Sequence, residues 1–463
     1  MFVRQRFTSN IPETFPGWGL VCAGLIVGIF ASSSEAQFFN NGGFQRSIGG
    51  VSVDAEGAVR DALVEDQDST LERMRENLAG GKAEFANESK LRMISLKAVQ
   101  AAMVLAAETG KPLSEEILLL GGLTRIEMVF VYPDKQDIVI AGPSEDWTIA
   151  KNGSVVGKKS GRPIVYLDDL ITAFQSVETA RTEGITCSID PTPEGSQRLN
   201  ALLRNVKTGP QFNPSMIEPA MREAFGPQVV SLTGLPKNSH MARIIFAADY
   251  QMKRYGMNLA EAPVKGLPSY IEMIRNKSVA VPQSRWWMAC DYDAIEHSQN
   301  GLAYKLSGKG IKTLTEAEVI ADDGSRKQTG KKDAMAQKWA DLFTEKLDEL
   351  STKDSVFGEL RNVMDACVVA AIVRGRDLEK ISGLDLSVLS GKTPTVELTS
   401  LNTPSQIDPQ CSFLKTSAGW VVTTSGGVSV DSWSVASKTE VNEELASVRS
   451  SVEQPESLDW TWK

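Results

Sequence analysis

The sequence predicts an α+β protein: a mixed β-sheet core with packed helices and a small C-terminal β element. Three observations lead to this prediction. Helical and strand-like periods alternate through the middle of the chain, which is typical of a sheet with helices against it. Residues 239–255 carry one apolar stripe at helical spacing. Hydrophobic residues make up 42% of the chain and charged residues 23%, which is enough for a sizeable core.

Residues 1–36 have the pattern of a signal peptide: a positive start, an apolar run over residues 17–31, and small residues before a cleavage point. Ser34 and Ala36 occupy the two positions that a signal peptidase recognises, so cleavage would leave Gln37 first. The apolar run is shorter than the roughly 20 residues of a membrane-spanning helix, although an uncleaved anchor stays the alternative. We therefore expect an exported protein, in the periplasm, the cell envelope or the medium, without a transmembrane segment in its mature chain.

The charge of the chain narrows the class of partner. The net charge is −9 and the isoelectric point is about 5.2. Nucleic-acid binding needs clustered Lys and Arg, and no such stripe occurs. The acidic balance also argues against a polybasic membrane-surface role. The expected partner is an envelope protein or a glycan.

Composition divides the chain into segments. They are a signal peptide (1–36), a flexible lead-in (37–67), a mixed α/β core (68–389) with a possible division near 280, a linker rich in Thr, Pro and Ser (390–411), a small β element (412–435) and a polar tail (436–463). In the tail, Val441, Leu445, Val448 and Val452 could line one face of a short helix.

The expected elements follow from caps, periods and turns. Helices over 69–80, 95–110 and 114–121 each begin at a serine cap and end at a glycine. Apolar runs bounded by turn residues predict strands over 125–131, 137–141, 147–150, 155–156, 185–189 and 229–232. Helical spacing predicts helices over 167–174, 193–206 and 239–255. The C-terminal part predicts a hairpin over 302–314 and long helices over 334–350 and 356–373.

One hexapeptide occurs twice. Gly-Gly-Val-Ser-Val-Asp stands at residues 49–54 and again at 426–431. Each copy has the alternation of a short strand after a flexible pair. Two interpretations stay open: related edge strands that are neighbours in one sheet, or coincidence between two turns rich in Gly, Val and Ser.

Four cysteines follow the signal segment, at positions 187, 290, 367 and 411. Outside the cytosol they permit up to two disulfides. We expect none or one, with Cys187 and Cys290 the favoured pair because both lie in short strand-like runs. Cys367 lies in an apolar helix, and a free buried thiol and a disulfide are equally compatible with that position.

Most catalytic signatures are missing from the sequence. The two histidines, His240 and His297, are not arranged as His-Glu-x-x-His, so no metal site is expected. No Gly-x-Ser-x-Gly elbow occurs. Residues 324–331 have the wrong glycine spacing for a phosphate loop, and Gly308-Lys309-Gly310 lacks the third glycine of a dinucleotide fingerprint. No cofactor is expected.

The remaining catalytic candidates are one histidine and several carboxylates. His240 follows Ser239 at a helix N-terminus, where the helix dipole favours the neutral imidazole of a general base. The alternative interpretation is that Ser239 caps the helix and His240 is a surface residue of its first turn. Asp249 is better placed to pair with Lys253, four residues on.

Asp168 and Asp169 stabilise a helix start, or one of them faces a cleft. Asp190 and Asp291 complete the set of candidate catalytic carboxylates. Arg285-Trp286-Trp287 with Asp291-Tyr292-Asp293 is the densest aromatic and charged group, and strand alternation would bury one tryptophan and expose the other. The exposed ring beside Arg285 suits ligand binding, or the pair is a core tryptophan with an ordinary surface neighbour.

Several stretches carry a resemblance to a known family: 130–143 (Phe-Val-Tyr-Pro-Asp-Lys-Gln-Asp-Ile-Val-Ile-Ala-Gly-Pro), 161–170, 187–195, 265–270, 285–287, 337–341 and 357–362. With them the chain, over roughly residues 90–435, resembles a family of secreted proteins, best known from planctomycete bacteria, that is defined only as a domain of unknown function. The resemblance implies export and a shared fold. It implies no activity and no catalytic residues.

The sequence thus supports two functions. The first is an exported cell-envelope protein that binds a partner or scaffold without catalysis. The second is an envelope hydrolase that acts on glycan or peptide through carboxylates. An enzyme should gather at least two of its candidate side chains within about 6 Å of each other in one concave pocket.

Overall fold

Two seven-stranded mixed sheets and the helices packed on them make up an α+β fold, as the sequence predicts. The computed structural model describes residues 51–53, 59–61, 85, 87–206, 213, 216–275, 283–320, 326–393, 398–409, 412, 414–416, 419–421, 425–452 and 460–462. All of these lie in one compact unit, residues 43–463. The predicted signal peptide with its cleavage point at Ala36 and Gln37, and the helix expected over 69–80, lie outside the described residues.

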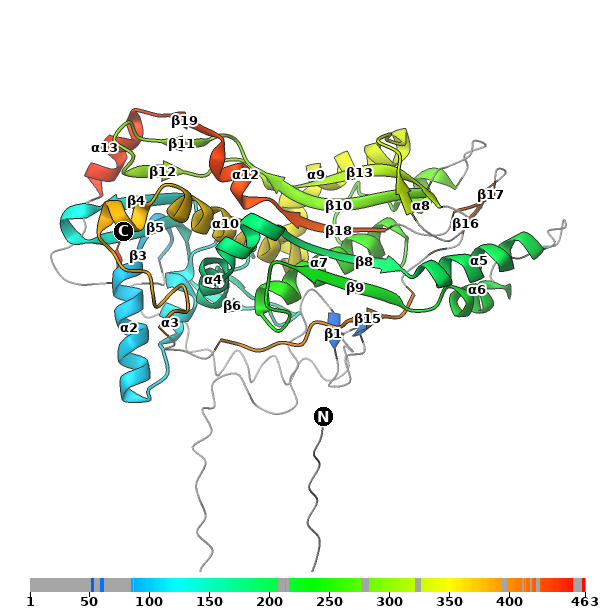
Figure 1. The fold of residues 1–463 in the computed structure, drawn as a ribbon, viewed down its shortest axis with the longest axis horizontal. Coiled ribbons are helices and arrows are strands. Elements are labelled where there is room, and N and C mark those ends of the chain that lie inside the picture. Colours follow the sequence, from blue (N-terminus) through cyan, green and yellow to red (C-terminus); the bar gives the residue numbers. More distant parts are fainter. Residues whose placement is uncertain are drawn as a thin grey trace, which may run out of the picture. The chain divides into compact units, whose positions relative to one another are not determined.

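The first sheet has the order β14-β13-β10-β18-β8-β9-β15. Its strands are β14 (Arg326–Gln328), β13 (Gly310–Ile320), β10 (Gln283–Asp291), β18 (Ser425–Val430), β8 (Ile185–Pro191), β9 (Gln228–Thr233) and β15 (Gln406–Ile407). Only the β10–β18 pair is parallel among these neighbours. Figure 1 shows β10, β18, β8 and β9 side by side, with β18 from the end of the chain in the middle.

The second sheet has the order β19-β11-β12-β4-β5-β3-β20. Its strands are β19 (Thr439–Val441), β11 (Ile295–His297), β12 (Ala303–Lys305), β4 (Met128–Tyr132), β5 (Asp137–Ser144), β3 (Ser89–Ser95) and β20 (Thr461–Trp462). Three two-stranded sheets join β1 (Val51–Val53) with β2 (Val59–Asp61), β6 (Trp147–Ile149) with β7 (Val155–Gly157), and β16 (Leu414–Thr416) with β17 (Gly419–Val421).

The helices begin at the caps that the sequence predicts in several places. They are α2 (Leu96–Thr109), α3 (Glu115–Leu118), α4 (Leu167–Glu183), α5 (Pro193–Asn205), α6 (Glu218–Phe225), α7 (His240–Gly256), α8 (Tyr270–Ile274), α9 (Ala334–Lys353), α10 (Ser355–Gly375), α11 (Leu378–Ser382), α12 (Ser432–Ser437) and α13 (Glu444–Ser451). Short 3-10 turns span Leu120–Gly122 and Pro133–Lys135. Ser95 and Ser239 both accept a hydrogen bond from the first turn of their helices.

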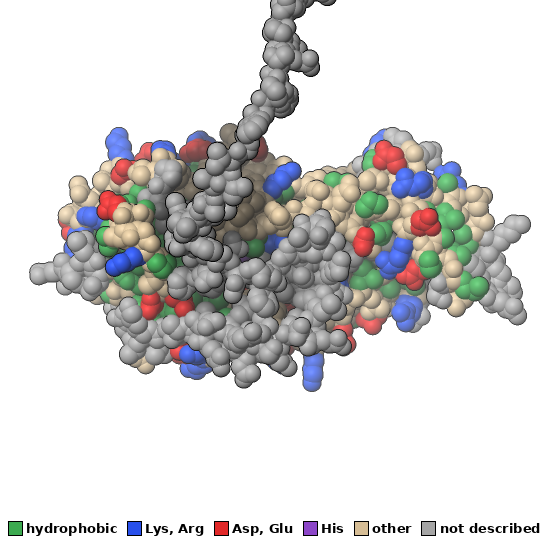
Figure 2. Space-filling model, turned by 90° about the horizontal axis from the view of Figure 1, so that it is seen from below, with side chains coloured by type: hydrophobic (Ala, Val, Ile, Leu, Met, Phe, Trp, Pro, Cys, Tyr) green, Lys and Arg blue, Asp and Glu red, His purple; other side chains and the backbone are tan. Residues whose placement is uncertain are grey.

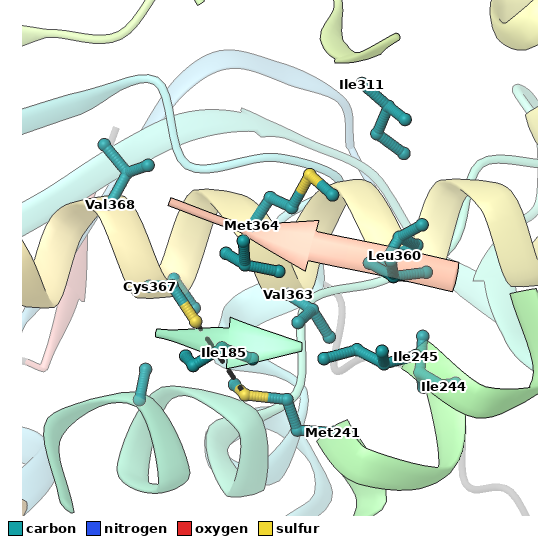
Figure 3. Packing of buried hydrophobic residues seen from close by; sticks show 14 of the residues in the cluster. Ile185, Met241, Ile244, Ile245, Ile311, Leu360, Val363, Met364, Cys367 and Val368 are labelled. Atoms are coloured by element: carbon teal, nitrogen blue, oxygen red, sulfur yellow. Dashed lines mark hydrogen bonds between the residues drawn. The ribbon is translucent and has the colours of Figure 1, made fainter. Parts of the chain in front are cut away.

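Helix α10 is the centre of the core. It is apolar on nearly all sides and every residue from Ser355 to Val373 is buried, as expected for a helix surrounded by other elements. It packs against α4, α7, α9 and α12. Figure 3 shows Leu360 and Val363 beside Ile244 and Ile245 of α7, while the Cys367 thiol reaches the Met241 sulfur at 3.8 Å.

Helix α7 is tied to the first sheet by a buried ion pair. The Lys253 ammonium contacts Asp249 at 3.0 Å, as the four-residue spacing predicts. It also donates to the carbonyl oxygens of Ile189 in β8 at 2.7 Å and Gly426 in β18 at 3.3 Å. Because an unpaired buried ammonium would be costly, these three acceptors fix α7 over the two strands.

The C-terminal residues belong to the core. In the segment 412–435, β16 and β17 form a small β element, but β18 pairs with β10 and β8 in the middle of the first sheet. In the tail 436–463, β19 pairs with β11, and α13 places Leu445, Val448 and Val452 against the second sheet. Val441 is instead 57% exposed on β19.

Two further segment boundaries differ from expectation. Strands from both sides of position 280 share each sheet, so no division occurs there in the described residues. The expected linker, 390–411, contributes β15, which pairs with β9. Long-range strand pairing thus includes residues whose composition is typical of a linker.

The repeated hexapeptide does not form neighbouring edge strands. Val51–Val53 of the first copy pairs with β2 in a sheet of its own, while the second copy lies inside the first sheet. The glycines of the second copy permit this insertion. An added Cβ on Gly427 would lie 1.8 Å from the carbonyl oxygen of Cys187.

We expect Gly427→Ala to lower the free energy of unfolding by about 3 kcal/mol or more, because β8 and β18 would have to separate. Gly330→Ala is the control, since its added Cβ would meet nothing within 4 Å and only its φ of +67° costs stability, about 1 to 2 kcal/mol. Urea denaturation measures both. Equal losses would contradict the steric explanation.

Candidate functional site

Two sequence-predicted candidates meet at the junction of α4 and α7. Nδ1 of His240 lies 3.0 Å from Oδ1 and 3.1 Å from Oδ2 of Asp169. Asp169 stands in the first turn of α4, and His240 is the first residue of α7. The Tyr166 ring lies 4.9 Å from the imidazole. Both side chains are buried, so His240 is not the surface residue that one interpretation expected.

The charge of the His240 ring is set by carboxylates and not by the helix dipole. Burial alone lowers the pKa of His240, but the charge and hydrogen bond of Asp169, with smaller contributions from Glu359 and Asp168, raise it above its ordinary value. Burial raises the pKa of Glu359, against the opposing effects of His240 and of hydrogen bonds from Ser154 and Ser355. The expected neutral imidazole is therefore disfavoured.

The other predicted carboxylates do not join this pair. Asp168 accepts a hydrogen bond from the Thr399 backbone at 3.1 Å. Asp190 lies on β8, and Asp291, at the end of β10, forms an ion pair with Lys312 at 3.1 Å. Asp169 and His240 satisfy the distance expected of an enzyme, but neither lines one of the two clefts described below.

The tryptophan pair divides between two faces of β10, as alternation predicts. Trp286 is fully buried, with ring-centroid distances of 4.5 Å to Trp339 and 4.8 Å to Tyr270. Trp287 is half-buried, and the Arg285 guanidinium lies 5.4 Å from its ring centroid. Trp286 therefore belongs to the core, whereas Arg285 and Trp287 stay candidates for ligand binding.

The favoured disulfide is not formed. Cys187 and Cys290 are free thiols, and β18 lies between their strands. Strands two apart are separated by about 10 Å, which is too far for a disulfide. Cys367 is also free, and Cys411 lies outside the described residues. Burial raises the pKa of Cys290 to about 12, so this thiol is not readily ionised.

A charged cleft lies where turns from both sheets meet α9 and α10. Its volume is about 490 Å³. Its lining is Arg125, Glu127, Arg162, Asp291, Asp293, Gly308, Lys309, Asp348 and Arg361, and "charged cleft" refers to these residues below. Of the predicted candidates only Asp291 lies there. Figure 2, which draws one face of the molecule, shows acidic and basic side chains interspersed among the described residues.

Ion pairs hold four of the eight charged side chains that line this cleft. Asp365 of α10 holds Arg125 through two bonds of 3.0 Å and accepts the Tyr292 hydroxyl at 2.6 Å. Arg361 donates to Asp348 at 2.9 Å. Within the described part of the chain, Arg162 and Lys309 have neither a side-chain hydrogen bond nor an ion-pair partner.

Glu127 is the carboxyl group of the cleft with an altered proton affinity. Burial raises its pKa, although Arg125, Arg162 and Arg361 oppose the shift and Asp365 adds to it. Burial and the charge of Arg125 lower the pKa of Arg361. The carboxyl groups of the cleft can therefore accept hydrogen bonds from a ligand, and its guanidinium groups can donate them.

Most of this cleft could not be predicted from the sequence, because its residues come from turns and helices far apart in the chain. One signal was available. Arg361 and Asp365 stand four apart in a largely apolar helix, and charges in such a helix indicate buried ion pairs. The backbone turns at Gly308 and Gly310, with φ of +108° and +84°. The hairpin expected over 302–314 is not formed, however, because β12 and β13 lie in different sheets.

A second cleft, of about 860 Å³, is lined by residues 258 and 260–269 with Tyr255 and Glu272. The Tyr255 hydroxyl donates to Asp354 at 2.7 Å. No predicted site residue lines this cleft. Across the described ranges, no three His, Cys, Asp or Glu side chains are grouped so as to hold a metal ion. A search of the same ranges finds no helix of the length and hydropathy that crossing a membrane requires.

The buried acids predict how stability depends on pH. Burial raises the pKa of Asp249 to about 6 and that of Asp354 to about 7, and it raises the pKa of Glu359. Above their ordinary pKa values of about 4, the folded protein then binds more protons than the unfolded chain. The charged His240 adds stability that is lost as pH rises through its raised pKa.

We therefore expect the free energy of unfolding to fall as pH rises from about 4.5 to 8, measured by urea denaturation in steps of pH. Asp354→Asn should flatten the slope between about pH 4 and 7, because it removes one titrating group. Asp341→Asn, which changes an exposed carboxylate of α9, should keep the wild-type slope. Stability that increases toward pH 8 would contradict this assignment.

Comparison with known proteins identifies part of the chain. Residues 187–270 match the model of a family described as a protein of unknown function, DUF1598. This span contains Asp190, His240 and the Asp249–Lys253 pair. No curated protein and no solved structure matches the chain. The comparisons therefore place this segment in an uncharacterised domain family.

Proposed function

We propose that the protein is a non-catalytic binding protein of the cell envelope, and that its charged cleft takes a polar ligand, a glycan or a peptide of an envelope partner. The exported location rests on the signal-peptide pattern of residues 1–36. The resemblance to secreted planctomycete proteins supports the same location.

One observation carries the binding role: fixed and unpaired charges lie together in a cleft of ligand size. Arg125 and Arg361 are held by carboxylates, whereas Arg162 and Lys309 keep their donors available. Glu127 and Asp293 offer oxygens on the same cleft. Polar groups held in place before binding recognise a ligand with a small loss of conformational freedom.

The buried Asp169–His240 pair argues against the first catalytic hypothesis. A general base must reach the proton that it removes, either directly or through one water. The imidazole is instead 8% exposed and bonded to Asp169. Its role is then to neutralise buried charge where α4, α7 and α10 meet.

A hydrolase is the second candidate, through a different set of carboxyl groups. Glu127, whose pKa is raised by burial, lines the same cleft as Asp291 and Asp293. An acid with a raised pKa near an ionised carboxylate is the pairing that glycoside hydrolysis uses. Of the catalytic residues predicted from the sequence, this hydrolase would use only Asp291, together with Glu127 and Asp293.

Saturation-transfer NMR on the purified protein tests both, with chitotriose, trigalacturonate and trialanine as probes. We expect at least one probe to bind without forming product. Where chitotriose or trialanine binds, Glu127→Gln/Asp293→Asn should weaken it about tenfold or more, because hydrogen bonds to charged groups contribute about 1.5–3 kcal/mol. Glu261→Gln/Glu272→Gln, at the second cleft, is the control.

Product detected by mass spectrometry, and lost in Glu127→Gln, would replace binding by hydrolysis. Binding of none of the probes, or equal binding of chitotriose or trialanine by both double variants, would contradict a role for the charged cleft.

A further inference from the structure

We infer that the charged cleft contains an oxyanion subsite, formed by Arg162, Lys309 and Arg361, that selects ligands bearing a carboxylate, sulfate or phosphate group. The inference rests on the proposed function and names the ligand class of the same cleft. It predicts that an acidic glycan is preferred over its neutral counterpart.

Arg361 is a fixed donor at the base of this subsite. Its side chain is 6% exposed, and its buried Nε has no hydrogen-bond partner. The stem packs on Gly310, where an added Cβ would lie 2.7 Å from Cγ of Arg361. Its counterion Asp348 is 63% exposed, so solvent screens that pair. The guanidinium is therefore held in place while its hydrogen bonds are incomplete.

Arg162 and Lys309 add two cations without partners. Each follows a glycine with positive φ, Gly161 at +70° and Gly308 at +108°, so each is presented by a tight turn. Both line the cleft with Arg361. An anion entering here would gain charge-assisted hydrogen bonds without first breaking an existing ion pair.

Two of the four carboxylates that line the cleft are held in ion pairs, and so are two of its four cations. Asp291 is paired with Lys312, and Asp348 with Arg361. Behind them, Asp365 is occupied by Arg125 and by the Tyr292 hydroxyl. Of the two remaining acids, Glu127 has a pKa raised by burial and its protonated form can donate to an oxyanion. Because Arg162 and Lys309 have no partner among the described residues, an anionic ligand can contact both cations directly.

The test compares trigalacturonate with its fully methyl-esterified form, which keeps the sugar scaffold and removes the charges. Isothermal titration at constant ionic strength measures both, with sodium sulfate and sodium phosphate as separate arms for the other oxyanions. At least one oxyanion probe should bind, and where this is trigalacturonate it should bind at least tenfold more tightly than its ester.

Two matched double variants separate the subsite from general electrostatics. Arg162→Gln/Lys309→Gln should weaken oxyanion binding at least tenfold. Lys331→Gln/Lys332→Gln removes the same charge from exposed positions outside the cleft and should change it less than twofold. Circular dichroism and thermal melting confirm that both variants fold.

Each outcome decides the question. Equal weakening by the two double variants, or undiminished binding in Arg162→Gln/Lys309→Gln, overturns the subsite. Binding of a neutral probe such as chitotriose with no response to any oxyanion overturns the subsite and leaves the proposed function standing. No binding of any probe overturns both.

Discussion

The buried ammonium of Lys253 is the constraint on which the arrangement of the first sheet depends. It lies within 3.3 Å of acceptors from α7, β8 and β18, and the acceptors in β8 and β18 are 64 and 173 positions from it in the chain. A lone ammonium in the interior would be strongly destabilising, so the three elements must come together for the charge to be buried at all. The glycines of β18 then allow its neighbours to approach closely, and the C-terminal strand becomes part of the core.

The same requirement explains why the most enzyme-like side chains of the sequence are not available for chemistry. Asp169, His240 and Glu359 compensate one another's charge at a helix junction. Such an arrangement stabilises one packing of α4, α7 and α10, since removal of any member leaves a buried charge without its partner. The charges on the turns behave differently, because they lie at an opening and several lack a partner. A place in the lining of the cleft, and not burial alone, thus distinguishes the groups that can meet a ligand, since Arg361 is buried and still lines the cleft.

The sequence predicted those features that depend on interactions between residues close together in the chain. The caps at Ser95 and Ser239, the Asp249–Lys253 pair and the burial of Trp286 with partial exposure of Trp287 are confirmed. Each depends on residues a few positions apart. The place of β18, the Asp169–His240 pair and the charged cleft depend on contacts over 71 to 240 positions, which no periodicity reports. Composition misled at 390–411 and 436–463, since polar segments can still provide strands that complete a sheet.

Helix α10 connects the closed interior with the open cleft. Glu359 faces the His240 pair, whereas Arg361 and Asp365, which share a face at four-residue spacing, serve the cleft. Residues two apart on a helix point to nearly opposite sides, so one buried helix can carry both functions without their charges competing for the same partner. Because every α10 residue from Ser355 to Val373 is buried, the donors and acceptors that it places at the cleft are held as firmly as the core itself. A binding site built on that helix is organised before its ligand arrives.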